Sequence, residues 1–252
     1  MKITSNRPHS LLSKTFDLTY GFFWGVLALP LILKRATDFA TIPKEQNYKT
    51  TNLSEVQDLT LIMDTYGSDK GSLNGYTKYY QEILSNKAIT IRNVLEIGIG
   101  TNDPNLLSNM GELGIPGASL RGWRDYAPNA LIYGADIDVR ILFVENRIKT
   151  FYVDQLKRKS LSELVSSLNT NLDLIVIDGL HTPRADLNSL LILLPTMSQN
   201  GDFIIEDIGE HAYKYFWPII AKRIAPYCTM TFQRSSIGRF LHIKFSSQSR
   251  AE

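Results

Sequence analysis

Two apolar segments of the sequence end in side chains that could do chemistry together. LDLIVIDGLH reaches Asp178 and then His181, and GDFIIED ends in Glu206 and Asp207. Carboxylates that lie close together repel one another unless a cation joins them, and Mg²⁺ prefers oxygen ligands. We therefore predict a divalent metal site on Asp178, Glu206 and Asp207, with Mg²⁺ as the first candidate.

His181 is expected to act as a general base beside that metal. Imidazole titrates near neutral pH, so it can take the proton from a hydroxyl group that then attacks a methyl donor. His211 is a rival base, which we interpret instead as a residue at the start of a helix. Taken singly, a packed histidine and a pair of acids capping a helix are the plainer interpretations. Their occurrence together at neighbouring strand ends favours a site.

A third segment, VLEIGIG, indicates a ligand of nucleotide type. It ends in Glu96 and continues into a turn with Gly98 and Gly100, where glycines allow a ligand to approach the backbone closely. A dinucleotide site would have a third glycine before its helix, which TNDPNLLSN does not supply. Glu96 would repel phosphate and favours S-adenosylmethionine (SAM), which carries a sulfonium and an ammonium. The alternatives are an ion pair at Glu96 and a tight turn without a ligand.

Two later strand ends supply further expected contacts to SAM. In YGADID, Asp136 is the better candidate to accept hydrogen bonds from both ribose hydroxyls, and Asp138 is the second choice. In VDQ, Asp154 and Gln155 could bond the edge of the adenine ring. The long stretch between Glu96 and Asp136 is expected to include a loop that covers the cofactor.

A parallel sheet would bring these strand ends to one edge. Strands alternating with helices indicate a doubly wound α/β fold, in which ligands bind beyond the carboxyl ends of the strands. We predict seven mostly parallel strands, a C-terminal antiparallel hairpin that turns around residues 235–238, and an N-terminal helical extension. Helices are expected over ASLRGWRDYA, over SLSELVSSL with a cap from Ser160 or Ser162, and over LNSLLILLPTM.

Length and composition fit one α/β domain with an appendage. The chain has 252 residues, of which 44% are hydrophobic and 21% charged, so it can bury a sizeable core. A net charge of +2 gives no argument for a nucleic-acid partner. The single cysteine, Cys228, excludes an intramolecular disulfide and suits the cytoplasm.

We divide the chain into three parts. Residues 1–50 form an apolar segment and a linker, residues 51–90 a helical lid or cap, and residues 91–252 the SAM-binding core. Asp69 and Lys70, in a turn bounded by glycines, are interpreted either as part of the lid or as a simple turn.

Residues 18–33 are sixteen consecutive residues without a charge. A helix of this length would measure about 24 Å, which is short for a hydrocarbon core of about 30 Å. Two interpretations weigh equally: a helix packed on the domain or in a dimer contact, and an anchor inserted in the cytoplasmic face of a membrane. A cleaved signal peptide is disfavoured because no small-residue cleavage site follows.

Taken together, the chain resembles the metal-dependent class I SAM methyltransferases that act on macrolide sugar hydroxyls. These are the mycinamicin and macrocin O-methyltransferase type, with cephalosporin-hydroxylase-like relatives nearby. The resemblance covers about Tyr66 to Asp207 and rests on YGSDKGSLNGYTKYYQEIL, VLEIGIG, SLRGWRDYAPNALIYGADI, VDQ, IVIDGLH and GDFIIED. It implies Mg²⁺ on Asp178, Glu206 and Asp207, His181 as the base, and SAM contacts at Glu96, Ser119, Asp136 and Gln155. The chain departs from the family at Ile177, where a second acid is usual.

The sequence therefore predicts a SAM-dependent O-methyltransferase that modifies a hydroxyl of a sugar, glycan or glycosylated metabolite. One alternative is an NAD-binding oxidoreductase, which would have no use for three acids at the strand ends. Another is a membrane-tethered module that binds SAM or a nucleotide without turnover. The expected partner is a small-molecule or glycan acceptor, and a homo-oligomer stays open.

Overall fold

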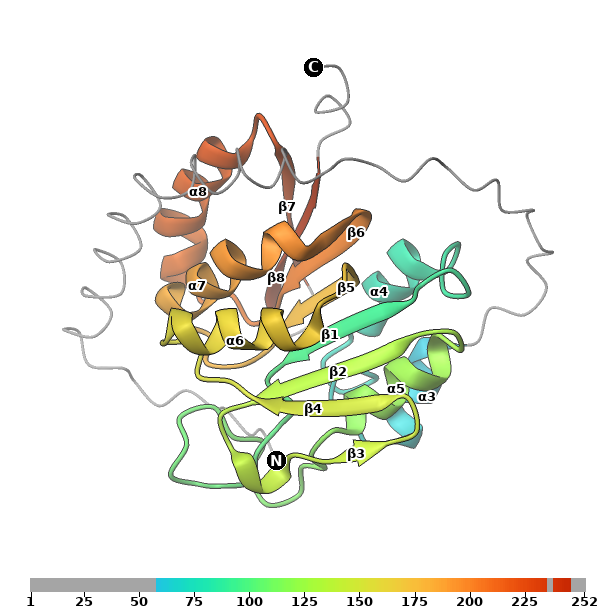
Figure 1. Cartoon of the computed structure of the whole chain (residues 1–252). Coiled ribbons are helices and arrows are strands. Elements are labelled where there is room, and N and C mark those ends of the chain that lie inside the picture. The colour runs from blue at the N-terminus through green and yellow to red at the C-terminus, as the bar shows by residue number, and fades with distance from the viewer. Residues whose placement is uncertain (1–57, 235–237, 246–252) are drawn as a thin grey trace.

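The structure, a computed structural model, describes residues 58–234 and 238–245 around one central sheet (Figure 1). Its eight strands lie in the order β3-β4-β2-β1-β5-β6-β8-β7. They are β1 (Asn93–Ile97), β2 (Leu131–Asp136), β3 (Val144–Glu145), β4 (Ile148–Tyr152), β5 (Leu172–Ile177), β6 (Met197–Ile205), β7 (Cys228–Arg234) and β8 (Arg239–Phe245). Neighbours from β4 to β6 pair in parallel, whereas β3, β7 and β8 pair antiparallel.

The predicted doubly wound sheet with a C-terminal hairpin is confirmed. The predicted number of seven strands is wrong, because the two-residue strand β3 adds an eighth at the edge beside β4. Two residues are too few to produce an alternating pattern that a sequence could reveal.

Helices cover both faces of the sheet, as Figure 1 shows. One face carries α6 (Arg158–Leu168), α7 (Pro183–Leu193) and α8 (Trp217–Ile224), and the other carries α3 (Leu59–Thr65), α4 (Thr77–Leu84) and α5 (Ala118–Tyr126). Three short helices, η1 (Val139–Ile141), η2 (Leu194–Thr196) and the π-helical η3 (Ala212–Phe216), complete the described elements.

Strand β5 and the second half of β6 are almost continuously apolar because each of their faces meets a separate core. In β5, Ile175 belongs to the core beneath α6, α7 and α8, whereas Val176 belongs to the core beneath α3, α4 and α5. Trp217 anchors the first core and Trp123 the second, and both side chains are buried. Burial on both faces is typical of parallel sheets and explains why the alternating pattern of a half-exposed strand is missing.

Two helix starts differ from the sequence prediction. The α7 helix begins at Pro183, because the Thr182 side chain accepts a hydrogen bond from the Ala185 amide and proline suits the first turn. The α6 helix begins at Arg158 without a side-chain cap, so the predicted serine cap is wrong. The Ser160 hydroxyl instead accepts a hydrogen bond from the Asp154 amide, 3.1 Å away.

Several sequence predictions fall outside the described residues, among them the segment 18–33 and the hairpin turn at 235–237. Within 58–234 and 238–245, no helix combines the length and the apolar character needed to cross a membrane.

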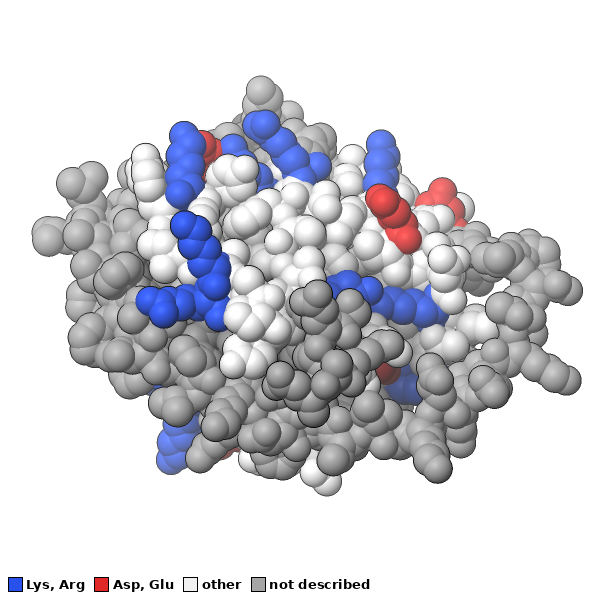
Figure 2. Space-filling model, turned by 90° about the horizontal axis from the view of Figure 1, so that it is seen from above, with Lys and Arg blue, Asp and Glu red and all other residues white. Residues whose placement is uncertain are grey.

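Acidic side chains gather inside the molecule more than on the surface seen in Figure 2. The described part of that surface carries several Lys and Arg side chains and few Asp or Glu. In contrast, Glu96, Asp202 and Glu206 expose 1% or less of their surface. These buried carboxylates must be stabilised by partners inside the fold.

Candidate functional site

A cavity of about 320 Å³ lies beyond the carboxyl ends of the central strands. Its wall includes residues from the ends of β1, β2, β4 and β5 and from the loop that precedes α5. Every site residue expected from the sequence except Glu206 lines it: Glu96, Gly98, Gly100, Ser119, Asp136, Asp154, Gln155, Asp178, His181 and Asp207. Residues 105–110 line it too, as expected for a covering loop.

The turn after β1 requires glycine at Gly98. Its φ is +91°, and a Cβ there would lie 2.1 Å from the carbonyl oxygen of Asp178. The Gly98 amide also donates a hydrogen bond to the Ala135 carbonyl, so the backbones of β1, β2 and β5 meet at this point. Because residue 98 has no side chain, backbone atoms form this part of the cavity wall.

Glu96, at the end of β1, is 1% exposed, and each of its carboxylate oxygens accepts a hydrogen bond. The Ser119 hydroxyl donates to its Oε1 at 2.7 Å, and the Trp123 indole donates to its Oε2 at 2.6 Å. Ser119 and Glu96 therefore act as one unit at the cavity wall.

Asp136 stands ready to accept further hydrogen bonds, whereas Asp138 does not. Asp136 accepts one backbone amide on each oxygen, from Ile99 and Asp138, and burial raises its pKa. Asp138 is hydrogen-bonded to Arg140 and Thr101, which together hold its pKa well below its usual range. Because each carboxylate oxygen can accept two bonds, the geometry favours Asp136 over the second choice.

Asp154 and Gln155 are largely occupied by the fold itself. The Asp154 carboxylate accepts the Leu156 amide at 3.0 Å and pairs with Lys157 at 3.0 Å. The Gln155 side chain donates to the Ser189 hydroxyl and accepts the Leu180 amide. Gln155 thus ties the loop after β4 to the loop after β5.

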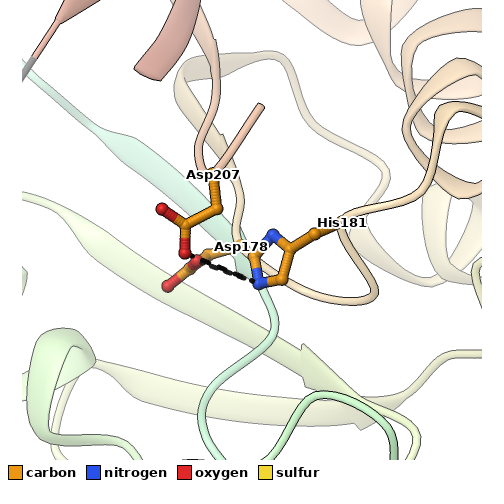
Figure 3. Close-up of side chains that lie close together, drawn as sticks. All are labelled: Asp178, His181 and Asp207. Atoms are coloured by element: carbon orange, nitrogen blue, oxygen red, sulfur yellow. Dashed lines mark ion pairs between the residues drawn. The ribbon is translucent and has the colours of Figure 1, made fainter. Parts of the chain in front are cut away.

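Asp178, His181 and Asp207 come together at the mouth of the cavity (Figure 3). The Nε2 atom of His181 lies 3.7 Å from Oδ1 of Asp178 and 3.9 Å from Oδ2 of Asp207. One ligand atom from each residue lies within 4.8 Å of the others, a spacing that could hold a metal ion. His181 and Asp207 both have positive φ, +52° and +54°, which is uncommon for these residues and marks tight local turns.

Glu206 lies beneath this group rather than within it. It is 1% exposed, its Oε1 accepts the Tyr80 hydroxyl at 2.5 Å, and its Oε2 accepts the Lys70 ammonium at 2.5 Å. The role of Glu206 as a third metal ligand stays a prediction. In this structure the Lys70 ammonium compensates its charge.

Lys70 lies among these acids, a position that the sequence did not reveal. It is 2% exposed, and its Nζ also lies 2.5 Å from Oδ2 of Asp178 and 3.5 Å from Oε1 of Glu96. Burial lowers the pKa of Lys70, but the carboxylates of Asp178 and Glu206 outweigh it and raise the pKa well above its usual range. The sequence marked Lys70 as part of a turn bounded by glycines, but no pattern in it indicated which acids Lys70 would contact.

Two acids at the ends of β5 and β6 have raised pKa values. Burial raises the pKa of Asp178 to about 6, against the opposing effect of Lys70. Burial also raises the pKa of Glu206 well above its ordinary value. Raised carboxylate pKa values in a cavity are typical of a site that binds a cation or moves protons.

No protein-family model matches the chain, but curated proteins do. A demethylmacrocin O-methyltransferase of Streptomyces fradiae is 32% identical over 162 residues, which cover 64% of this chain and 38% of the relative. A mycinamicin VI 2''-O-methyltransferase of Micromonospora griseorubida is 29% identical over 166 residues, 66% of this chain and 38% of the relative. An 8-demethyl-8-alpha-L-rhamnosyl tetracenomycin-C 2'-O-methyltransferase of Streptomyces olivaceus is 29% identical over 61% of this chain and 37% of the relative.

Solved structures agree with these relatives. A crystal form of the MycE methyltransferase of mycinamycin biosynthesis, in complex with Mg and SAH, aligns with a TM-score of 0.53 and 27% identity. That alignment covers 66% of this chain and 39% of the MycE chain. A second MycE crystal form aligns with a TM-score of 0.60 over 79% of this chain.

The chain is therefore similar over about two thirds of its length to O-methyltransferases that include two macrolide relatives. It spans well under half the length of the curated relatives it matches, between 37% and 41%.

Proposed function

We propose that this protein is a SAM-dependent O-methyltransferase that modifies a hydroxyl of a sugar, glycan or glycosylated metabolite. The observation that carries the proposal is a single cavity with two kinds of wall. One wall has the Glu96 and Asp136 strand ends, which suit a cationic nucleoside, and the other has the Asp178, His181 and Asp207 group. A methyl donor and an acceptor hydroxyl could therefore meet there.

The residues of the second wall fit a divalent cation such as Mg²⁺. Oδ2 of Asp178 accepts a hydrogen bond from the Lys70 ammonium, and Oδ1 of Asp207 accepts one from the Tyr76 hydroxyl. The other oxygen of each carboxylate is the one that lies nearest His181. Hard carboxylate oxygens that can share an ion are the donors Mg²⁺ prefers. When bound, such a cation supplies positive charge that makes a hydroxyl easier to deprotonate.

His181 is proposed to remove the proton from the acceptor hydroxyl. Its Nε2 faces the two carboxylates, and the negative charge of Asp178 at 3.7 Å would stabilise the imidazolium that forms. SAM, when bound, supplies the methyl group on its sulfonium. Asp136 is proposed to accept the ribose hydroxyls, Glu96 to attract the positive charge of SAM, and Gln155 to hold the wall of the cavity.

The relatives support this assignment without identifying the acceptor. Two of their names give a glycosylated compound, a rhamnosyl tetracenomycin-C and an L-olivosyl-oleandolide, and one MycE structure is a complex with Mg, SAH and mycinamycin VI. The acceptor is therefore proposed at the level of a hydroxyl on a glycosylated molecule.

A calorimetric titration tests the proposal. The protein is titrated with SAM and with NAD, each with and without Mg²⁺, and labelled methyl transfer to a glycosylated acceptor is then measured. We expect SAM to bind, NAD not to bind, and transfer to need a divalent cation. NAD binding without SAM binding would favour an oxidoreductase, and SAM binding without transfer to any glycoside would favour a non-catalytic module.

A matched pair of variants tests whether SAM binds in the cavity. Asp136→Asn should weaken SAM binding about tenfold or more, because hydrogen bonds to a charged acceptor are stronger than those to a neutral one. Asp173→Asn is the control, since Asp173 lies at the opposite end of the sheet, where it accepts the Arg92 and Asn93 amides. Equal effects of the two substitutions would contradict the assignment of Asp136.

Attachment to a membrane through residues 18–33 stays a prediction. Removing residues 1–40 should move the protein from a membrane fraction to the supernatant if that segment anchors it. Identical fractionation of the truncated and full-length chains would end the anchor hypothesis.

A further inference from the structure

The turn between β5 and α7 carries the proposed base in an uncommon backbone conformation. His181 has a φ of +52°, and its ring lies beside the carboxylates of Asp178 and Asp207 (Figure 3). A residue other than glycine keeps a left-handed conformation only where its surroundings fix it. The groups that hold the turn 179–181 therefore decide where the base lies.

Gln155, from the loop after β4, contacts this turn directly. Its Oε1 accepts the Leu180 amide at 2.9 Å, so it bonds the residue immediately before the base. A Cβ at Gly179 would lie 2.1 Å from the same oxygen, which shows how closely the side-chain amide packs against the turn. Because Gln155 is 7% exposed, water has little access to compete for this hydrogen bond.

Helix α7 fixes Gln155 from the other side. The Nε2 atom of Gln155 donates to the Ser189 hydroxyl at 3.0 Å, and that hydroxyl in turn donates to the Ala185 carbonyl. The main-chain oxygen of Gln155 accepts a hydrogen bond from the Asn188 side chain at 3.0 Å. A glutamine amide has one acceptor atom and one donor atom, and both of them already have a partner within the protein.

We propose that Gln155 is a positioning residue, which holds the turn 179–181 and thereby sets the position of His181. This role differs from the contact to the adenine edge expected from the sequence, because the side-chain amide bonds Leu180 and Ser189. The inference rests on the proposed function, since it takes His181 to be the base. Residues 154–156 also line the cavity, so one loop forms part of the wall and fixes the base.

The first test is Gln155→Met, which keeps the length of the side chain and removes both of its hydrogen bonds. The turn can then shift, and a displacement of about 1 Å can lower a rate about a hundredfold. We expect single-turnover methyl transfer at saturating SAM to fall about tenfold to a hundredfold, while SAM affinity stays within about threefold. A large loss of SAM affinity with an unchanged rate at saturating SAM would make Gln155 a cofactor contact and overturn the proposal.

Calorimetry with Mn²⁺, used as a probe of the divalent-cation site, accompanies this test. Gln155→Met should bind Mn²⁺ as the wild type does, because its two side-chain bonds go to Leu180 and Ser189 and not to the carboxylates. Mn²⁺ affinity that fell in step with methyl transfer would mean that the substitution disorganises the whole end of β5. That result would overturn a role confined to the base.

Gln81→Met is the matched control. The Oε1 atom of Gln81 also accepts a backbone amide, that of Leu59 at 3.0 Å, but Gln81 lies in α4 and is not among the described residues that line the cavity. The substitution removes the same kind of hydrogen bond away from the turn, so transfer per folded molecule and SAM affinity should not change. An equal loss of transfer in Gln81→Met would attribute the effect to general loosening of the fold and overturn the proposal.

A double-variant cycle decides whether Gln155 acts through His181. Gln155→Met should lower transfer in the wild-type background and cause no further loss, within about twofold, in the His181→Ala background. Residues that act as one unit give such non-additive losses. Losses that multiply in the double variant would mean that Gln155 acts independently of the base, and they would overturn the proposal.

Gly179→Ala tests the same contact even if Gln155→Met does not fold. The three atoms nearest to the new methyl group would all belong to the side-chain amide of Gln155, so the substitution pushes that amide away from the Leu180 amide. Transfer should fall as in Gln155→Met, again without further loss in the His181→Ala background. Full transfer in a folded Gly179→Ala protein would overturn the proposal, and far-UV circular dichroism establishes that each variant is folded.

The proposed function fails by different results. A wild-type protein that binds no SAM contradicts the proposed function. Transfer that does not depend on His181 contradicts the base and, with it, the role of Gln155. Normal SAM binding and a rate that depends on His181, combined with losses that multiply in the double variant, contradict only the role of Gln155.

Discussion

Strand β6 contributes to two buried charged clusters, and their contrast indicates which one binds a ligand. Asp202, Ile204 and Glu206 alternate with residues of the other core, so all three point toward the layer that contains α4. Glu206 belongs to a group with Glu96, Asp178 and Asp207 beside the cavity, which we call the carboxylate cluster. Asp202, four residues earlier, belongs to a second group with Tyr79, Lys87 and His242, which we call the Asp202 cluster.

The Asp202 cluster is rich in partners for a single acid. The carboxylate is 0% exposed, accepts a hydrogen bond from the Lys87 ammonium and lies 2.7 Å from Nε2 of His242. Lys244 approaches it at 3.4 Å, and the Tyr79 hydroxyl lies 2.7 Å from the other nitrogen of His242. Burial raises the pKa of Asp202, but His242 and Lys87 outweigh it and leave the pKa lowered.

The carboxylate cluster has the opposite balance. Three acids, Glu96, Asp178 and Glu206, contact the single ammonium of Lys70, and Asp207 adds a fourth carboxylate nearby. Burial leaves the pKa values of Asp178 and Glu206 raised. Each cluster contains a lysine and a tyrosine that belong to α4 or lie close to it in the sequence, so the types of side chain do not distinguish the two clusters. The excess of negative charge in the carboxylate cluster distinguishes the two, because only a cation or a proton from outside can relieve it.

The largest expected difference concerns the two histidines. His181→Ala should keep SAM binding and lower methyl transfer by about 10²–10⁴-fold, because it removes the proposed base. His242→Ala should leave transfer per folded molecule unchanged, since His242 contacts the Asp202 cluster only. Single-turnover transfer of labelled methyl measures both, and unchanged transfer in His181→Ala would remove that residue from the mechanism.

The next difference is in stability. Asp202→Ala should lower the free energy of unfolding by about 3–5 kcal/mol, because it strands the positive charge of Lys87 and breaks a buried network. Urea denaturation followed by tryptophan fluorescence measures the loss, and SAM affinity of the folded protein serves as the control. A loss below about 1 kcal/mol would mean that water replaces the lost partner.

The pH dependence of stability should have opposite signs in the two clusters. The pKa of Asp178 is about 6 in the folded chain, against 3.8 for an unperturbed aspartate. Between these values the folded chain binds more protons than the unfolded chain, so stability falls as pH rises from about 4 to 6. Asp202 has a lowered pKa, so its contribution is present above its unfolded pKa and is lost as pH falls through the folded one.

Asp178→Asn tests that sign in protein kept free of metal with a chelator. Above pH 6 the variant should be more stable than the wild type by about 2 kcal/mol, and the difference should disappear near pH 4. Urea midpoints across this pH range measure it. A variant less stable than the wild type at pH 7.5 would mean that the pair with Lys70 outweighs the burial of the charge.

The smallest effects separate two tyrosines of the same helix region. Tyr76→Phe removes the hydroxyl that holds Asp207, and we expect Mn²⁺ affinity to fall about threefold to tenfold with little change in stability. Tyr79→Phe should lower stability by about 1 kcal/mol and leave Mn²⁺ affinity unchanged. If both variants changed the same quantity, the two clusters would be coupled through α4.

Much of the fold was predictable from local patterns. The apolar runs that end in Glu96, Asp136, Asp178 and Glu206 are strands β1, β2, β5 and β6 with their carboxyl ends at one edge. What the patterns missed was short or irregular: the two-residue β3, the start of α7 at Pro183, and the uncapped start of α6. Elements this brief carry too few residues for a period to appear.

The acidic residues of the site could be predicted from the sequence, but the residues that contact them could not. The sequence by itself determined that carboxylates and His181 would gather beyond the strand ends, because strand period and crossover topology follow from the order of apolar and polar residues. Only the tertiary structure decided that Lys70 would neutralise Glu206, which lies 136 residues away along the chain, and leave Asp178, His181 and Asp207 as the open group. No local pattern contains that choice, because a buried charge is stabilised by whichever opposite charge the packing brings within reach.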